Sequence, residues 1–211
     1  MRAIGVDEAG KGPVIGSLFV AGVLNFEGLE KIGVKDSKML SPSKRAYIAT
    51  LIEDATEVHV VEMTAREIDE GRKKQTLNAI MVDLFSEVFE RFLPDRAFVD
   101  AADVIQERFA TNIRAQYEKN VKREIDIISE WKADIRYPIV SAASIVAKVH
   151  RDRSIKQLAT EIGTEIGSGY PSDKRTVKFL RALIEEKGDD LPPYIRRSWK
   201  TVEKLIPVEK A

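Results

Sequence analysis

The first twelve residues, Met1–Gly12, restrict the possible folds of this chain more than any other segment. A short apolar run, Ala3–Val6, leads directly into two adjacent acids, Asp7 and Glu8, and then into the glycine-flanked segment Gly10–Gly12. An apolar run this short, bounded by glycine, predicts a buried strand and not a helix. Two carboxylates at the end of a buried strand are costly unless a cation or a cationic partner neutralises them, and hard ions such as Mg²⁺ or Mn²⁺ prefer such oxygen ligands. The alternative is a strand end that reaches solvent with ordinary surface acids.

The glycines that follow the acids form neither of the two common nucleotide-binding motifs. A dinucleotide-binding loop needs G-x-G-x-x-G between a strand and a helix, whereas Gly10, Gly12 and Gly16 are spaced G-x-G-x-x-x-G. They lead into Val14–Leu24, an apolar run that predicts a second strand. A Walker loop needs Ser or Thr after Gly-Lys, but Lys11 is followed by Gly12. The sequence therefore predicts a bare backbone turn that a substrate can approach closely beside the two acids.

Composition limits the kind of protein this chain can be. Its 211 residues, 44% of them hydrophobic, are enough for one substantial core with a small C-terminal appendage. The formal net charge is zero, so nucleic-acid binding would need a local basic cluster. The absence of cysteine excludes disulfides and thiol catalysis, and two histidines, His59 and His150, argue against a histidine-rich zinc site. The opening apolar run is too short for a signal peptide or a membrane span, so we expect a cytoplasmic protein.

Helix and strand patterns alternate after the two opening strands. Ser41 followed by Pro42 predicts a helix start, and Thr64 predicts another. The apolar stripe of Leu77–Phe92, ended by Pro94, is typical of a helix that lies on a sheet. Further strands are expected at Glu57–Glu62, Arg96–Val99 and Ile125–Ser129, and further helices at Ile105–Tyr117, Tyr137–Ile162, Thr176–Glu186 and Ser198–Leu205.

Six motifs occur in the order found in type 2 ribonucleases H. They are Asp7–Gly12, Lys35–Lys38, Phe98–Asp100, Lys132–Asp134, Ala142–Lys148 and Ser168–Asp173. The chain resembles a ribonuclease HII of the archaeal kind over nearly its whole length. The resemblance implies an α/β fold, the ribonuclease H-like fold, with a mixed sheet of three antiparallel strands followed by parallel ones, flanked by helices. It also implies a catalytic domain, residues 1–165, and a small helical C-terminal extension, residues 166–211, that carries the Ser-Gly-Tyr motif.

The resemblance implies that four acids, Asp7, Glu8, Asp100 and Asp134, are both catalytic residues and metal ligands. Four carboxylates in one site raise each other's pKa values, so they stay ionised together only when divalent cations neutralise them. The implied cofactors are two divalent cations, Mg²⁺ or Mn²⁺, one to activate water and one to stabilise the departing 3′ oxygen. We expect Asp7, on the opening strand, to bridge both ions. Taken singly, Asp100 and Asp134 are also compatible with a surface acid or a helix cap.

Substrate specificity is expected to come from three residues after the acids and from one tyrosine. In the family that the chain resembles, the segment that corresponds to Gly10, Lys11 and Gly12 contacts the 2′-hydroxyl of the ribonucleotide through backbone groups. The tyrosine of the Ser-Gly-Tyr motif, here Tyr170, stacks on the next sugar. Only the 2′-hydroxyl distinguishes RNA from DNA at a given site. Taken alone, a tyrosine such as Tyr170 is more often a half-buried structural residue.

Three basic residues, Lys38, Lys148 and Arg151, are the candidates for contacts with phosphate. Lys38 belongs to the Asp-Ser-Lys motif, and the other two follow Ser144 in the expected helix. Basic residues on a helix face are more often simply solvated, which is the alternative for all three.

The resemblance implies an endoribonuclease that hydrolyses the RNA strand of RNA/DNA hybrids and cuts on the 5′ side of ribonucleotides embedded in duplex DNA. It would leave 3′-hydroxyl and 5′-phosphate ends and remove RNA primers and misincorporated ribonucleotides. The alternatives are a junction resolvase of the same fold, without the Gly10–Gly12 and Tyr170 pair, and a catalytically silent hybrid-binding protein. A monomer is expected. A replication clamp is a possible partner, although the C-terminal segment Ile206–Ala211 carries no clear clamp-binding motif.

Overall fold

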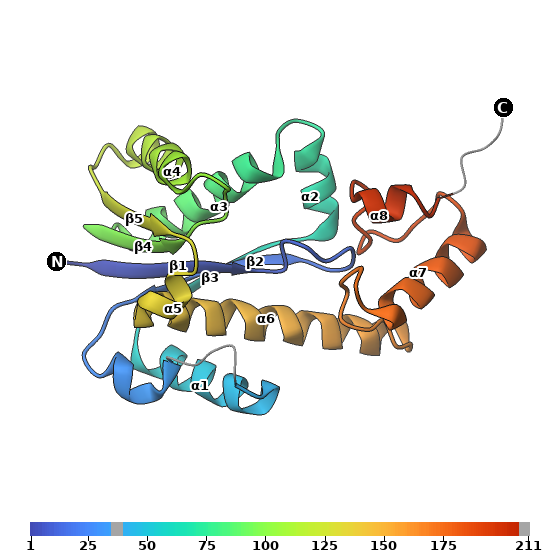
Figure 1. The fold of residues 1–211 in the computed structure, drawn as a ribbon, viewed down its shortest axis with the longest axis horizontal. Coiled ribbons are helices and arrows are strands. Elements are labelled where there is room, and N and C mark those ends of the chain that lie inside the picture. The colour runs from blue at the N-terminus through green and yellow to red at the C-terminus, as the bar shows by residue number, and fades with distance from the viewer. Residues whose placement is uncertain (35–39, 207–211) are drawn as a thin grey trace. The chain divides into compact units, whose positions relative to one another are not determined.

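Five strands form one mixed sheet in the computed structural model, which describes residues 1–34 and 40–206 (Figure 1). The strand order is β3-β2-β1-β4-β5. Strand β1 pairs with β2 in antiparallel orientation and with β4 in parallel orientation, and β4 pairs in parallel with β5. The strands are β1 (Ala3–Ala9), β2 (Leu18–Leu24), β3 (Val58–Met63), β4 (Arg96–Asp100) and β5 (Asp126–Glu130). The expected mixed sheet is confirmed.

The helices begin and end largely where the sequence predicts. Ser41 accepts a hydrogen bond from the backbone N–H of Lys44 at the start of α1, and Thr64 forms a capping box with Glu67 at the start of α2. Helix α3 ends at Phe92, two residues before Pro94. The helical elements are η1 (Leu29–Ile32), α1 (Pro42–Ala55), α2 (Ala65–Arg72), α3 (Leu77–Phe92), α4 (Gln106–Val121), α5 (Ala133–Arg136), α6 (Pro138–Ile162), α7 (Lys174–Lys187) and α8 (Lys200–Glu203).

Both opening strands differ from their predicted bounds. Strand β1 does not stop before the acids, because its pairing with β2 continues to the pair Ala9↔Phe19. Asp7 and Glu8 therefore lie within the strand and are held by its ladder. Strand β2 begins only at Leu18, because Gly16 has a positive φ of 85° and interrupts the extended backbone. The apolar residue Ile15 forms an isolated bridge with Ile195 instead.

The chain divides into two compact units. The first comprises residues 1–9, 19–62 and 76–150, and the second comprises residues 10–18, 63–75 and those from Arg151 onward. The division falls within the continuous helix α6, and the second unit takes two segments from earlier in the chain. The catalytic domain of residues 1–165 and the extension of residues 166–211 stay a prediction.

Helices cover both faces of the sheet in the first unit (Figure 1). On one face lie α3 and α4, which meet through the edge-to-face ring pairs Phe85–Phe109 and Phe89–Tyr117. On the other face lie α1 and the first half of α6. A Cβ added to Gly5 would come within 2.3 Å of the carbonyl oxygen of Ile139, so helix α6 packs directly against β1 at this point. This close packing fixes the residues of α6 beside the acidic end of β1.

The second unit has its own apolar core. Residues of the loop after β1, the second half of α6, helix α7 and the C-terminal segment share it. Its buried members are Val14, Ile15, Ile155, Ile166, Leu180, Leu183, Ile184, Leu191, Ile195 and Val202. Among the residues that the structure describes, no helix has the length and apolar character needed to cross a membrane.

Candidate active site

Two of the four predicted catalytic acids lie side by side at one edge of the sheet. In the parallel pair of β1 and β4, Val6 is the partner of Val99, so the next residues, Asp7 and Asp100, follow on adjacent strands. The carboxyl ends of parallel strands meet at the same edge of a sheet. Asp7 is buried, with 4% of its surface exposed. Its immediate neighbour Glu8 is half-buried and donates a backbone hydrogen bond of 2.7 Å to Oδ1 of Asp7.

The fourth acid, Asp134, is joined to this edge by a short helix. Strand β5 ends at Glu130, and helix α5 begins at Ala133. The backbone N–H of Ala133 donates a 3.0 Å hydrogen bond to Oδ1 of Asp100. Asp134, the next residue, is 4% exposed. The ends of β1 and β4 and the start of α5 therefore bring three acids of distant sequence position into one region of the first unit.

The surroundings of Asp7 disfavour its ionised form. Burial raises its pKa well above the usual value, and the charges of Glu8 and Asp100 raise it further. A hydrogen bond from the Ser144 hydroxyl and the positive charge of Lys148 act in the opposite direction but do not cancel the rise. Lys148 Nζ itself donates a 2.6 Å hydrogen bond to Ser144 Oγ. Helix α6 thus supplies the groups that orient and partly neutralise Asp7.

The donor set at this edge fits a hard divalent cation. All of its candidate ligands are carboxylate oxygens, the type that Mg²⁺ and Mn²⁺ prefer. Within residues 1–34 and 40–206, no three acidic or histidine side chains are arranged as a metal-binding group. The case for a metal ion here therefore rests on the ligand type and on the local charge. A bound cation would offset the burial and the repulsion from Glu8 and Asp100 that raise the pKa of Asp7.

We expect Asp7→Asn to raise the stability of the metal-free protein. An acid with a raised pKa in the folded state costs no stability below its unfolded pKa, near about 4, where it is protonated in both states. Above that pH the unfolded state ionises first, so wild-type stability falls as pH rises towards the folded pKa. The midpoint of thermal unfolding in EDTA should therefore be higher for Asp7→Asn at pH 7, with a smaller difference at pH 4. A wild-type protein that is at least as stable as the variant at pH 7 would contradict the pKa direction.

The second unit contains the other predicted substrate-binding elements. Gly10 has a φ of 93°, and a Cβ added there would lie 2.7 Å from the carbonyl oxygen of Ser17. Only glycine is tolerated at such a position. A Cβ added to Gly12 would lie 3.5 Å from Cε1 of Tyr170, whose side chain is 36% exposed. The structure therefore brings Gly12 and Tyr170 together, although they are far apart in the sequence.

A buried arginine that the sequence analysis missed holds the glycine loop. Arg196 has no exposed surface, and its guanidinium donates to the carbonyl oxygens of Gly16, at 2.8 Å, and Lys11, at 3.3 Å. It also lies 5.0 Å from the ring centroid of Trp199. Burial lowers its pKa to about 10, with a further contribution from the charge of Arg151. No sequence signal distinguishes Arg196 from a surface charge, because its acceptors are backbone carbonyls some 180 residues away in the chain.

The three predicted phosphate contacts have different surroundings. Lys148 lies with the acids of the first unit, beside Ser144. Arg151 is buried in the second unit, next to Tyr170. Lys38 lies outside the described residues. The roles assigned to all of these side chains stay predictions.

Comparison with known proteins gives a consistent result over nearly the whole chain. The family model described as Ribonuclease HII matches residues 4–202. The Ribonuclease HII of Methanothrix thermoacetophila is 50% identical over 210 residues, which cover 97% of either chain. The solved ribonuclease H2 from Pyrococcus horikoshii has a TM-score of 0.87 at 43% identity, with 97% of each chain covered. The RNase HII of Archaeoglobus fulgidus, solved as a complex with PCNA, has a TM-score of 0.85 at 39% identity and covers 95% of this chain and 96% of that one.

Proposed function

The chain belongs to the ribonuclease HII family and is a ribonuclease H, and from this we propose the details of its reaction. It hydrolyses the RNA strand of RNA/DNA hybrids and cuts on the 5′ side of a ribonucleotide embedded in duplex DNA, leaving 3′-hydroxyl and 5′-phosphate ends. Removal of RNA primers and misincorporated ribonucleotides is the corresponding role.

One observation carries the catalytic part of the proposal. Burial of Asp7 raises its pKa, and the neighbouring negative charges of Glu8 and Asp100 raise it further. Asp7, Glu8, Asp100 and Asp134 would hold two divalent cations, Mg²⁺ or Mn²⁺, through their oxygens. When bound, such ions activate water for attack on phosphorus and stabilise the leaving 3′ oxygen.

The other residues orient the acids and the substrate. Ser144 donates its hydroxyl hydrogen bond to Asp7, and Lys148 supports Ser144. The backbone of Gly10–Gly12, which is kept bare by the absence of side chains at both glycines, reads the 2′-hydroxyl. Tyr170 stacks on the sugar of the next nucleotide, where the lack of a hydroxyl favours contact with an aromatic ring.

The experiment that tests this function measures cleavage of a labelled RNA/DNA hybrid in Mg²⁺, in Mn²⁺ and in EDTA. We expect RNA-strand cleavage in either metal and none in EDTA, because the acids need a cation to act. Single-stranded RNA of the same sequence serves as the control substrate. Cleavage of the hybrid that persists in EDTA would refute the role proposed for the four acids.

Lys148→Ala should weaken binding of a hybrid regardless of its sequence and reduce the salt slope of log affinity by about one, because a phosphate contact releases a counterion. The same outcome is expected for Lys38→Ala. Affinity is measured in EDTA, where no cleavage occurs, over a series of salt concentrations. Lys156→Ala, an exposed lysine of the same helix α6, is the matched control. If the salt slope of log affinity does not change in either variant, both lysines are solvated surface residues that do not contact phosphate.

A replication clamp is the protein partner that we propose. The relative from Archaeoglobus fulgidus was solved in complex with PCNA, and its likeness to this chain supports the same kind of partner here.

A further inference from the structure

Arg151 contacts the ring of Tyr170. Its guanidinium carbon lies 4.8 Å from the ring centroid, within the range of a cation–π interaction. Arg151 is only 8% exposed, whereas Tyr170 keeps 36% of its surface. One side of the tyrosine ring is therefore covered by a buried cation, while part of the residue stays exposed to solvent.

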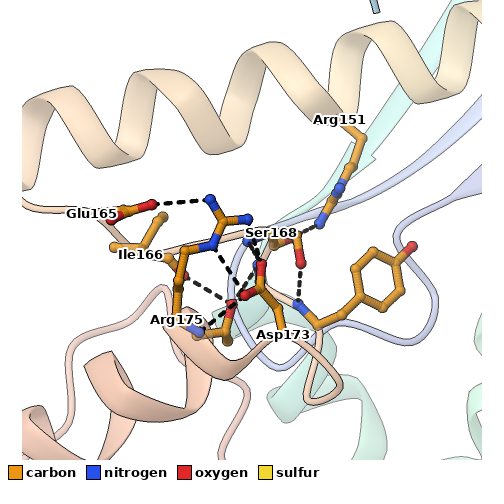
Figure 2. A network of polar contacts seen from close by, with 9 residues as sticks. Arg151, Glu165, Ile166, Ser168, Asp173 and Arg175 are labelled. Atoms are coloured by element: carbon orange, nitrogen blue, oxygen red, sulfur yellow. Dashed lines mark hydrogen bonds and ion pairs between the residues drawn. The ribbon is translucent and has the colours of Figure 1, made fainter. Parts of the chain in front are cut away.

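The same guanidinium is fixed by two further contacts. Nη2 donates a hydrogen bond to the carbonyl oxygen of Ser168, two residues before Tyr170 (Figure 2). Nη1 pairs with Oδ1 of Asp152 at 3.0 Å. The guanidinium group of arginine is planar, so it can lie against a ring and donate hydrogen bonds in its own plane at the same time. The ammonium group of lysine cannot do both. Because Arg151 already has these partners and is buried, its surroundings do not favour a phosphate contact.

The backbone around Tyr170 is also held by contacts that do not involve Arg151. Asp173 accepts from the backbone N–H of Ser168 at 2.8 Å and pairs with Arg175, whose other partner is Glu165 (Figure 2). These donors keep the pKa of the Asp173 carboxyl well below its usual range. Thr176 Oγ1 accepts from the N–H of Gly169 and donates to the carbonyl of Ile166, both at 2.9 Å. Asp173 and Thr176 therefore hold this turn together with the hydrogen bond from Arg151 to Ser168.

With the backbone held in this way, the position of the Tyr170 ring depends on the torsion angles of its side chain. Gly12 lies next to the ring of Tyr170 but has no side chain that could hold the ring in place. The contact between the planar guanidinium of Arg151 and the ring then restricts the position of the ring. We infer that Arg151 is a positioning residue that acts through Tyr170, holding the ring ready to stack on the sugar, and that it does not contact phosphate. This inference rests on the stacking role proposed for Tyr170.

A double-mutant cycle tests this inference. Arg151→Met and Arg151→Lys are made in the wild type and in Tyr170→Ala, and kcat and KM are measured on a duplex that carries one ribonucleotide. In the wild-type background we expect Arg151→Met to lower kcat/KM about five- to thirtyfold. Arg151→Lys should be nearly as impaired although it keeps the charge. In the Tyr170→Ala background, either change should cost less than about twofold, because the residue through which Arg151 acts is gone.

Two controls accompany the cycle. Arg153→Met alters an exposed arginine of the same helix and should leave kcat/KM unchanged. Circular dichroism and thermal unfolding establish that each variant is folded. If Arg151→Met does not fold, the comparison of Arg151→Lys in the two backgrounds carries the same test.

The outcomes separate the inference from the function on which it rests. Losses at Arg151 that persist in full in the Tyr170→Ala background would overturn the positioning role, as would a salt slope of binding that falls by about one in Arg151→Met. Recovery of wild-type kcat/KM by Arg151→Lys would do the same. A Tyr170→Ala variant with unchanged activity would refute the stacking role itself, and the positioning role with it.

Discussion

Asp7→Asn and Asp100→Asn are each expected to lower the rate of cleavage by about 10³-fold or more, equivalent to at least ~4 kcal/mol of activation free energy. Each change removes one carboxylate, proposed here as a metal ligand, from the region of the sheet where β1 and β4 end. Asparagine has nearly the same shape, so the fold should survive. The measurement is the single-turnover rate on an RNA/DNA hybrid at saturating Mg²⁺.

The matched control for these acids is Asp54→Asn, which alters an exposed acid of α1 and should cleave at the wild-type rate. Circular dichroism establishes that all three variants are folded. If Asp7→Asn or Asp100→Asn kept more than roughly a tenth of the wild-type rate, a loss below ~1.4 kcal/mol, the assignment of these acids to metal-ion catalysis would be wrong.

Tyr170→Ala is expected to cost up to about 150-fold in kcat/KM on a duplex that carries a single ribonucleotide. This estimate uses the ~1–3 kcal/mol of binding free energy that is lost per base when a stacked aromatic side chain is replaced by alanine. It is an upper value, because a sugar has no π-face. Tyr170→Phe keeps the ring and should keep most of the activity. A continuous hybrid should suffer less than the single-ribonucleotide duplex, because it can bind in many registers.

The comparison of the two substrates decides the role of Tyr170. Equal losses on both, or a Phe variant as impaired as the Ala variant, would show that the ring is not a stacking sensor. Tyr47→Ala, which removes an exposed ring from α1, is the control for nonspecific effects of losing a tyrosine.

The elements of the fold that are encoded locally could be predicted from the sequence. The stripe of Leu77–Phe92 predicts α3 because helical periodicity repeats over four turns. The caps at Ser41 and Thr64 predict helix starts because each hydroxyl satisfies a backbone N–H a few residues away. The bounds of β1 and β2 could not be predicted, because strand ends depend on pairing with a distant partner and on the positive φ of Gly16.

In the candidate site, too, local motifs could be predicted from the sequence, whereas contacts between distant residues could not. The acids Asp7 and Asp100 are recognisable from their motifs, but their adjacency depends on the register Val6↔Val99. The sequence places Arg151 on a helix, where an arginine is most simply interpreted as solvated. Its contact with Tyr170 exists only because the turn that follows α6 folds back onto that helix. Arg196 could not be found because carbonyl acceptors carry no signature in the side-chain sequence.

The most direct test of the account is cleavage of a DNA duplex that carries one ribonucleotide, with both ends of the cut mapped. We predict a single cut on the 5′ side of the ribonucleotide in Mg²⁺ or Mn²⁺, with 3′-hydroxyl and 5′-phosphate ends. No cut is expected in EDTA or in the same duplex made entirely of DNA. A cut on the 3′ side of the ribonucleotide, a cyclic or 3′-phosphate end, or equal cleavage of the all-DNA duplex would contradict the account.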